Sequence, residues 1–275
     1  MRVTTRRAAA AFAALALALT ACGDDGDNGT AEGETDGEAA ADVDLVSDGT
    51  LTVCTESPYE PFEFEDPDSP TGYSGFDMDL MYEIAQGAGL DMAVVNSGFD
   101  ALTSGAAMTA GTCDVAASAM TITEERAENV DFSDEYYESL QSLLVPGDSD
   151  ISSIADLTEG VTVGVQSGTT GEEYAEENVP GATLQAFEGG GDLVTALAAG
   201  QIDAILQDLP RNEAVVAQDG SYEIVEEYDT DEVYGFALEK GREDGLLDLI
   251  NSGLQDLRDS GRYDELFEQY FVTIE

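Results

Sequence analysis

The chain has 275 residues, with 59 acidic side chains, 9 basic side chains and no histidine, and its formal net charge is −50. A protein this acidic offers no basic surface to the phosphates of a nucleic acid, and without histidine it lacks the most common general base and metal ligand. The hydrophobic content of 43% still predicts a globular body with its own core.

The charge also indicates the working environment. Residues 22–275 carry 6 basic and 59 acidic side chains, which is a net charge of −53. Self-repulsion of this size opposes a compact fold at low ionic strength, and dissolved salt screens it. We therefore expect a salt-rich, halophilic environment.

The first 21 residues have the pattern of an export signal. A basic start is followed by an apolar run that is too short for a permanent membrane helix. The run ends in LTAC at 19–22, which resembles the bacterial lipobox, so we expect cleavage before Cys22 and a lipid on its thiol. An ordinary signal peptide with an incidental cysteine is the alternative. The Arg6-Arg7 pair leaves open whether export is of the Sec or the twin-arginine type.

The segment over 22–44 is predicted to be a flexible acidic tether. Within it, residues 23–41 contain seven acids and five glycines but no large apolar side chain. Such a segment cannot bury enough surface to offset its ordering entropy. A tether behind a lipid anchor would hold the folded body at the outer face of the cell membrane.

Strand-like and helix-like segments alternate beyond residue 44, which favours an α/β fold with largely parallel sheets. The strand-like segments are 51–55, 91–95, 113–119, 139–145, 161–166, 183–188, 203–207 and 234–238. The helix-like segments are 77–88, 100–110, 171–178, 191–199, 210–218, 244–259 and 263–270.

A weak internal echo suggests two similar lobes. GTCDVA at 111–116 and GQIDAI at 200–205 each follow a predicted helix and enter a predicted strand. In open parallel sheets ligands bind at the carboxyl ends of strands, so two such lobes would face each other across a cleft. Alternatively, the pattern is only a common helix-to-strand connector.

Cys54 and Cys113 remain after the lipobox cysteine. In an oxidising compartment such a pair is more often bridged than free, and a disulfide is plausible if their strands are neighbours. Two buried thiols that never meet are the alternative. Two sulfurs without histidine do not make a metal site, and we expect neither a metal nor a cofactor.

Arg126 is the only basic side chain between Arg7 and Arg211. A guanidinium in so acidic a stretch could grip a ligand carboxylate with two parallel hydrogen bonds. The structural alternative is an ion pair with Glu124, Glu128 or Asp131. Spacing alone does not separate the two interpretations.

Two further segments end in polar groups at predicted strand ends. QSGTTG at 166–171 precedes a helix start, whose free N–H groups can bind an anion or simply form a capping turn. Asp208 closes another strand and could bind an ammonium group, or it could cap the helix that Pro210 opens.

Aromatic and acidic side chains follow the first two strands. Tyr59 and Phe99 lie in corresponding loops and could enclose a ligand side chain, although each is individually more typical of core packing. Glu56 in the first of these loops could contact a polar or cationic group of the ligand.

Together these segments resemble the family 3 extracellular solute-binding proteins, which deliver polar amino acids to ABC transporters. The resemblance covers residues 50–272 in order and spacing. It rests on LTVCTESPYEPFEF (51–64), GFDMDL (75–80), MTITEER (120–126), VDFSDEYY (130–137), VGVQSGTTG (163–171), DAILQD (203–208) and YGFA (234–237).

The resemblance implies a two-lobe, periplasmic-binding-protein-like fold of type II. Lobe 1 would span 45–138 plus 235–275 and lobe 2 would span 139–234, with two hinge strands joining mostly parallel sheets. It also implies a membrane-anchored monomer that binds its ligand and an ABC permease and is not an enzyme. The Cys54–Cys113 pair is not general to the family, but its strands would be adjacent in lobe 1.

The resemblance further implies a site for an amino acid. Arg126, Thr121 and the N–H of Thr170 would hold the α-carboxylate, while Asp208 and the carbonyl of Ala119 would hold the α-ammonium. Ala119 stands where the family usually has glycine.

By the same resemblance, Tyr59 and Phe99 would flank the ligand side chain. Glu56 and Gln166 would sort ligands by polarity. A cationic or amide side chain fits them best. The alternatives are a compatible solute such as ectoine in the same transport role, and a ligand-sensing receptor module.

Overall fold

The computed structural model describes residues 43–271. The predicted export signal, the predicted lipidation site Cys22 and nearly all of the predicted tether lie outside the described residues. Within 43–271, no helix combines the length and the apolarity that crossing a bilayer requires.

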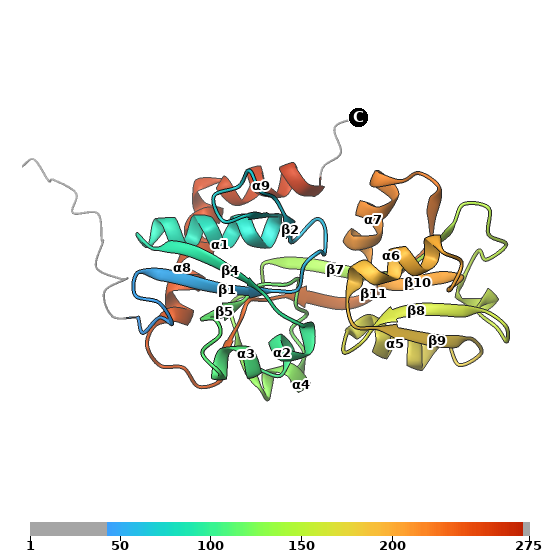
Figure 1. Cartoon of the computed structure of the whole chain (residues 1–275), viewed down its shortest axis with the longest axis horizontal. Coiled ribbons are helices and arrows are strands. Elements are labelled where there is room, and N and C mark those ends of the chain that lie inside the picture. The colour runs from blue at the N-terminus through green and yellow to red at the C-terminus, as the bar shows by residue number, and fades with distance from the viewer. Residues whose placement is uncertain (1–42, 272–275) are drawn as a thin grey trace, which may run out of the picture. The chain divides into compact units, whose positions relative to one another are not determined.

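The first lobe is built on a five-stranded sheet in the order β4-β1-β5-β12-β6 (Figure 1). Its strands are β1 (Thr50–Thr55), β4 (Asp91–Asn96), β5 (Val115–Ala116), β6 (Val130–Phe132) and β12 (Ala237–Glu239). The short hairpin β2 (Phe64–Glu65) and β3 (Tyr73–Ser74) lies beside it. β1 is buried from Leu51 to Thr55, as expected for a strand inside a parallel sheet.

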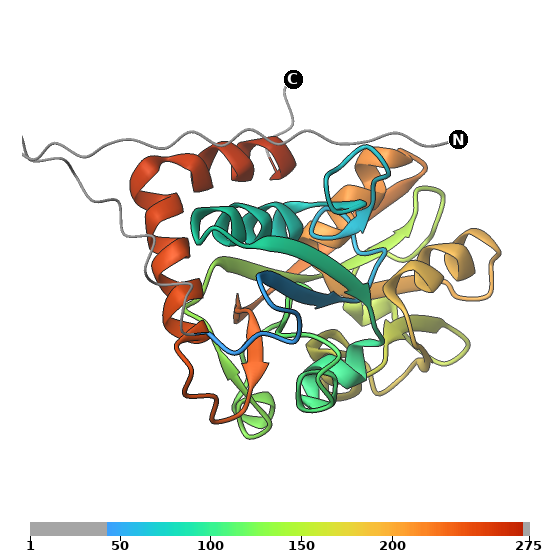
Figure 2. The ribbon, with the colours of Figure 1, turned by 60° about the vertical axis from the view of Figure 1, so that its left-hand side comes forward.

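Helices cover both faces of this sheet. One core contains α1 (Phe76–Gly87), α8 (Leu246–Ser260) and α9 (Arg262–Phe271), and the other contains α2 (Phe99–Thr103) and α3 (Ala106–Thr109). α8 and α9, drawn in red, lie along α1 in Figure 2. α8 buries Leu246, Leu249, Ile250, Leu254 and Leu257, the spacing of one helical face.

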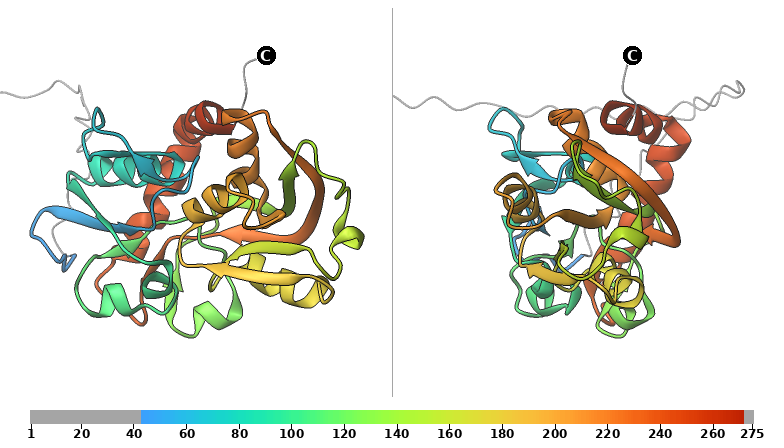
Figure 3. Two further views of the ribbon diagram at one scale, coloured as in Figure 1. Left: turned by 45° about the vertical axis from the view of Figure 1, so that its right-hand side comes forward. Right: turned by 90° about the vertical axis from the view of Figure 1, so that its right-hand side faces the viewer.

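The second lobe has a sheet in the order β11-β7-β10-β8-β9. Its strands are β7 (Tyr137–Pro146), β8 (Thr162–Gln166), β9 (Thr183–Phe187), β10 (Ala204–Asp208) and β11 (Tyr222–Tyr234). α5 (Thr170–Asn178) packs on one face, while α6 (Gly190–Ala198) and α7 (Leu209–Gln218) pack on the other (Figure 3). A 3-10 turn, η2 (Ile154–Asp156), precedes β8.

The internal echo of the sequence is a structural equivalence. Asp114 and Asp203 hold the same position in the two lobes, because each accepts a backbone hydrogen bond from the parallel strand that pairs with the strand following it. The Thr52 N–H on β1 donates to Asp114 and the Thr162 N–H on β8 donates to Asp203, both at 2.8 Å. The two sheets therefore share this local arrangement.

Each sheet is mixed rather than wholly parallel. β4, β1 and β5 are parallel, as are β9, β8 and β10, and each trio is extended by antiparallel strands. The long strands β7 and β11 pair with each other, and the chain passes between the lobes at the lobe-1 end of this pair. These are the two strands that join the lobes.

Several elements differ from the sequence expectations. The helix expected over 100–110 is split by Gly105, whose φ of 73° is left-handed and whose added Cβ would lie 2.9 Å from the Asn129 carbonyl oxygen. The strand expected over 113–119 ends at Ala116. β11 was not predicted, because its alternation is hidden among six acids within 222–234.

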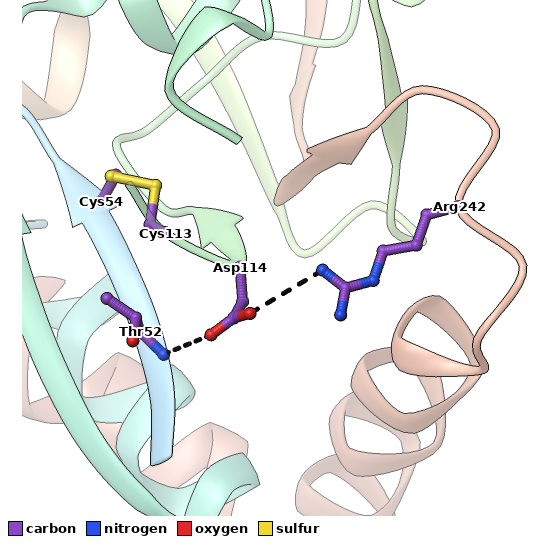
Figure 4. Close-up of a disulfide and its surroundings, with 5 residues drawn as sticks. All are labelled: Thr52, Cys54, Cys113, Asp114 and Arg242. Atoms are coloured by element: carbon purple, nitrogen blue, oxygen red, sulfur yellow. Dashed lines mark hydrogen bonds and ion pairs between the residues drawn. A yellow bond between two sulfur atoms is a disulfide. The ribbon is translucent and has the colours of Figure 1, made fainter. Parts of the chain in front are cut away.

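The structure joins Cys54 on β1 to Cys113 before β5, the pairing that the sequence favoured (Figure 4). The Cα atoms of the two cysteines are 5.7 Å apart. Beside the disulfide, the fully buried Asp114 accepts the N–H of Thr52 and lies 3.8 Å from an Arg242 guanidinium nitrogen. The disulfide and Asp114 thus tie the two strands whose ends lead into the cavity described next.

Candidate functional site

A cavity lies between the two lobes, at the carboxyl ends of β1, β8 and β10. The empty space among its side chains is about 310 Å³, part of it open to solvent. Its lining residues are Glu56, Tyr59, Phe99, Ser118, Ala119, Thr121, Arg126, Gln166, Thr169, Thr170 and Asp208. All nine ligand-binding residues singled out from the sequence are among them, and Ser118 and Thr169 are additional.

Arg126 enters the cavity from α4 (Glu124–Ala127), a single turn capped by the Thr123 hydroxyl. Its guanidinium donates to the Thr121 carbonyl at 2.8 Å and, across the lobes, to the Gly168 carbonyl at 3.0 Å. It also lies over the ring of Phe99, 5.2 Å from the centroid. Two of its five N–H groups are engaged in these bonds, so others are free for a ligand.

The ion-pair alternative for Arg126 is not realised. Asp131 pairs instead with Lys240 at 2.8 Å. Within residues 43–271, Arg126 forms no ion pair with Glu124, Glu128 or any other carboxylate. The guanidinium is nevertheless only 8% exposed. A buried cation without a carboxylate partner is the arrangement expected where an anion binds.

Asp208 lies at the end of β10 and is 8% exposed. It occupies the N-cap position of α7, but its side chain makes no capping hydrogen bond, so capping is not its role. It accepts hydrogen bonds from the Tyr234 hydroxyl and from the Gln141 amide, the latter at 2.5 Å. Burial and the charge of Glu232 raise the pKa of Asp208 to about 6, against the lowering effect of these bonds.

Glu232 is a buried carboxylate on β11 that the sequence did not reveal. One of its oxygens accepts the hydroxyls of Thr121 and Thr170, each at 2.8 Å. The other accepts the Gln141 amide at 3.0 Å and the Thr230 hydroxyl at 2.9 Å. Glu232 therefore links a threonine of each lobe, and through Gln141 it is connected to Asp208.

The capping alternative for the segment after β8 is partly right. Thr169 caps α5, and its hydroxyl accepts the Glu172 N–H at 3.2 Å. Thr170 is the first residue of the helix, where the backbone N–H has no partner within the helix. The segment therefore both caps the helix and offers an N–H to the cavity.

Ala119 has a φ of 45°, in the left-handed region that favours glycine. Its N–H donates to Asp77 at 2.8 Å, and the Tyr136 hydroxyl donates to the same oxygen at 2.7 Å. Next to it, the Ser118 hydroxyl donates to the buried Glu63 at 2.6 Å. Burial raises the pKa of both Asp77 and Glu63. This acidic layer fixes the loop that follows β5.

The opposite end of the cavity contains Tyr59, Glu56 and Gln166. The Gln166 amide donates to Glu56 across the lobes at 3.2 Å. Burial raises the pKa of Glu56, while the hydrogen bond from Gln166 and the charge of Arg211 oppose the rise. Glu56 thus already has a hydrogen-bond donor from the second lobe.

Arg211 and Glu60, which lie just outside the cavity lining, were also missed. Arg211 is the only basic residue within 139–234, among 20 acids. The scarcity argument that singled out Arg126 applies equally to Arg211. Glu60 and Glu232 carry no such signal, because each is one acid among 59.

Comparison with known proteins identifies the class. Residues 51–273 match the model of the bacterial extracellular solute-binding proteins, family 3, and the chain belongs to this family. The ABC transporter glutamine-binding protein GlnH of Bacillus subtilis (strain 168) is 33% identical over 257 residues, which is 92% of each chain.

Two other proteins extend the comparison. A probable histidine-binding protein of Campylobacter jejuni is 33% identical over 222 residues, covering 80% of this chain and 84% of that protein. The structure of an ancestral arginine-binding protein bound to glutamine superposes with a TM-score of 0.75 at 36% identity, over 82% of this chain and all of that one. The fold is the two-lobe type II fold of amino-acid-binding proteins. These relatives are named as binding proteins, not as enzymes.

Proposed function

We propose that this chain is the extracytoplasmic substrate-binding component of an ABC importer and captures a polar L-amino acid with a cationic or amide side chain. One observation carries the proposal: the cavity between the lobes is lined by two buried residues of opposite charge, Arg126 of the first lobe and Asp208 of the second. A zwitterion needs fixed charges of opposite sign at its two ends.

The α-carboxylate is held by Arg126 and by the N–H of Thr170. The hydroxyl protons of Thr121 and Thr170 are both donated to Glu232. Because a hydroxyl has one proton, these side chains offer a ligand only acceptors. We therefore assign the Thr121 hydroxyl to the ammonium end, beside Asp208 and the Ala119 carbonyl, and not to the carboxylate end that the family resemblance implied.

Binding couples to closure of the lobes. The ligand first docks on lobe 1 through Arg126, and rotation about β7 and β11 then brings Asp208 and Thr170 onto it. We take lobe 1 as 45–138 plus 235–275 and lobe 2 as 139–234. Closure is a population shift, driven by the greater affinity of the closed form for the ligand.

The side-chain preference follows from Glu56 and Gln166. The carboxylate of Glu56 repels an acidic side chain and accepts a hydrogen bond from a cation or an amide. A ligand must replace the Gln166 donor at Glu56, and an arginine, lysine or glutamine side chain can do so. Tyr59 and Phe99 would enclose its aliphatic part.

The remaining features complete the proposal. The chain would be a monomer that is anchored through a lipid on Cys22, presents its ligand to the permease subunits, needs no cofactor and works in high salt. It would bind without catalysing a reaction, in keeping with the names of its relatives.

Ligand-dependent thermal unfolding in high salt tests the proposal. A ligand at a hundred times its Kd should add about 2.7 kcal/mol to the free energy of unfolding. We expect a raised Tm with arginine, lysine, ornithine, glutamine or histidine and none with glutamate. A shift with ectoine alone would change the ligand class and keep the transport role. No shift with any of these, from a folded and ligand-free sample, would contradict the proposal and favour a sensing module.

Amino acid affinity should fall below about pH 6. The pKa of Asp208 in the empty cavity is raised to about 6, so protonation competes with the ligand ammonium below that pH. The affinity should be constant above pH 6 and weaken up to roughly tenfold per pH unit below it. The stability of the empty protein responds oppositely: a raised carboxyl pKa stabilises the fold below pH 4 and this contribution is lost toward pH 6.

Titration calorimetry between pH 5 and 8 measures the affinity. Asp208→Asn should bind roughly a hundredfold more weakly, with no dependence on pH in this window. The same pH dependence in Asp208→Asn would assign the titration to another carboxyl group that lines the cavity, such as Glu56, whose pKa burial also raises.

A further inference from the structure

Arg211 is a basic residue of lobe 2 that lies at the boundary with lobe 1. Residues 139–234 contain 20 acidic side chains and this one basic side chain. Arg211 lies in the first turn of α7, and its side chain is only 5% exposed. It does not line the ligand cavity. The partner of this buried cation is therefore a group of the protein outside the ligand cavity.

That partner is Glu60 in the loop that follows β1. The Arg211 guanidinium lies 2.7 Å from the Glu60 carboxylate and donates a longer bond of 3.4 Å to the Glu60 carbonyl. Among the ion pairs within residues 43–271, this is the one that joins the two lobes. It connects segments 151 residues apart in the sequence.

The same guanidinium also contacts a wall of the ligand cavity. It lies over the ring of Tyr59, 5.6 Å from the centroid. Such cation–π contacts contribute most where the cation is desolvated, as it is here. Arg211 thus lies outside the ligand cavity but contacts Tyr59, which lines it.

Three successive glycines let the same loop approach lobe 2 closely. A Cβ on Gly190 would lie 2.8 Å from the Tyr59 ring, and one on Gly191 would lie 3.2 Å from the Pro58 ring. A Cβ on Gly189 would lie 3.1 Å from the Glu56 carboxylate. The start of α6 therefore has no side chains at the positions where the loop over 56–60 packs against it, and this allows the close approach.

We infer that the Arg211–Glu60 pair is a latch that stabilises the closed arrangement of the lobes, with Arg211 as a positioning residue that sets Tyr59. Both lobes are acidic, so bringing them together is opposed by charge repulsion. One partly buried ion pair across the boundary offsets part of this repulsion, and it forms only on closure. The test by ligand affinity rests on the proposed function. The test by lobe separation does not.

The first test measures lobe separation without ligand. Nitroxide labels on Glu128→Cys and Glu176→Cys, one exposed position in each lobe, report the inter-lobe distance by pulsed electron paramagnetic resonance, with Cys22→Ser in every sample. We expect Arg211→Met to lower the closed fraction at least threefold. Arg262→Met is the matched control, because it removes the same charge from an ion pair within lobe 1. It should leave the distances unchanged.

The second test is a double-mutant cycle on ligand affinity. Arg211→Met and Glu60→Gln should each weaken binding roughly tenfold, and the double variant should be no weaker than either. Glu60 is 28% exposed, so its variant tests the latch even if Arg211→Met unfolds. Arg211→Lys should recover part of the affinity.

Unchanged distances in Arg211→Met together with additive or absent effects in the cycle would overturn the latch. If the wild type binds no amino acid but Arg211→Met still loses its closed fraction, the proposed ligand is wrong and the latch stands. If ligand binds and neither variant changes distance or affinity, the latch is wrong and the proposed function stands.

Discussion

Replacing Arg126 with alanine should abolish measurable amino acid binding. In the proposed site, the change removes two charge-assisted hydrogen bonds to the ligand carboxylate, each contributing roughly 1.5–3 kcal/mol. It also leaves that carboxylate facing Asp208 and Glu232, whose charges act on Arg126 in the empty site. We expect a loss of roughly 10²–10⁴ in affinity, measured by titration calorimetry.

Two control variants test whether the loss of binding comes from the guanidinium at position 126. Arg126→Lys keeps the charge but loses the planar fork, so it should retain weak binding. Arg262→Ala removes a cation from an exposed ion pair and should bind like the wild type. If Arg126→Ala, with an unchanged Tm, binds within threefold of the wild type, the carboxylate is held elsewhere.

Replacing Gly75 with alanine should cost about 4 kcal/mol of unfolding free energy or prevent folding. Gly75 is the N-cap of α1 with a φ of 127°, and an added Cβ would lie 2.1 Å from the carbonyl oxygen of Phe62. Backbone atoms cannot move aside as a flexible side chain can. Phe62 is fully buried among the aromatic rings of lobe 1, so the strain would spread into that core.

Gly72 provides the matched control for Gly75. Its φ is 80°, but a Cβ at Gly72 would meet no atom within 4 Å. Gly72→Ala should therefore cost only the left-handed strain of about 1–2 kcal/mol. Equal losses for the two variants in urea unfolding would show that backbone conformation, not the contact with Phe62, sets the requirement for glycine at 75.

Each of the few basic side chains beyond residue 22 has a defined contact or lines the cavity. Residues 22–275 contain six, and four of them form ion pairs within the described part of the chain: Arg211, Lys240, Arg242 and Arg262. Arg258 lies over Tyr263 instead. Arg126 alone lines the cavity. In so acidic a protein, the position of a basic residue predicts a functional or structural role better than the position of an acidic residue does.

Local sequence patterns determined most of the secondary structure. The β-branched residues of β1, the periodic leucines of α8 and the repeated aspartates at 114 and 203 are signals carried by a few neighbouring residues. Most of the nine predicted cavity residues were also singled out from local patterns, while the family resemblance assigned their roles and added Thr121 and Ala119.

Only the tertiary structure decided which acids matter. Glu232, Glu60 and Glu63 have no local feature that separates them from the other acids of the chain. Their roles depend on burial and on partners far away in sequence: Thr121 is 111 residues from Glu232, and Arg211 is 151 residues from Glu60. A carboxylate becomes functional when folding removes its water and supplies specific donors, and no short segment encodes that environment.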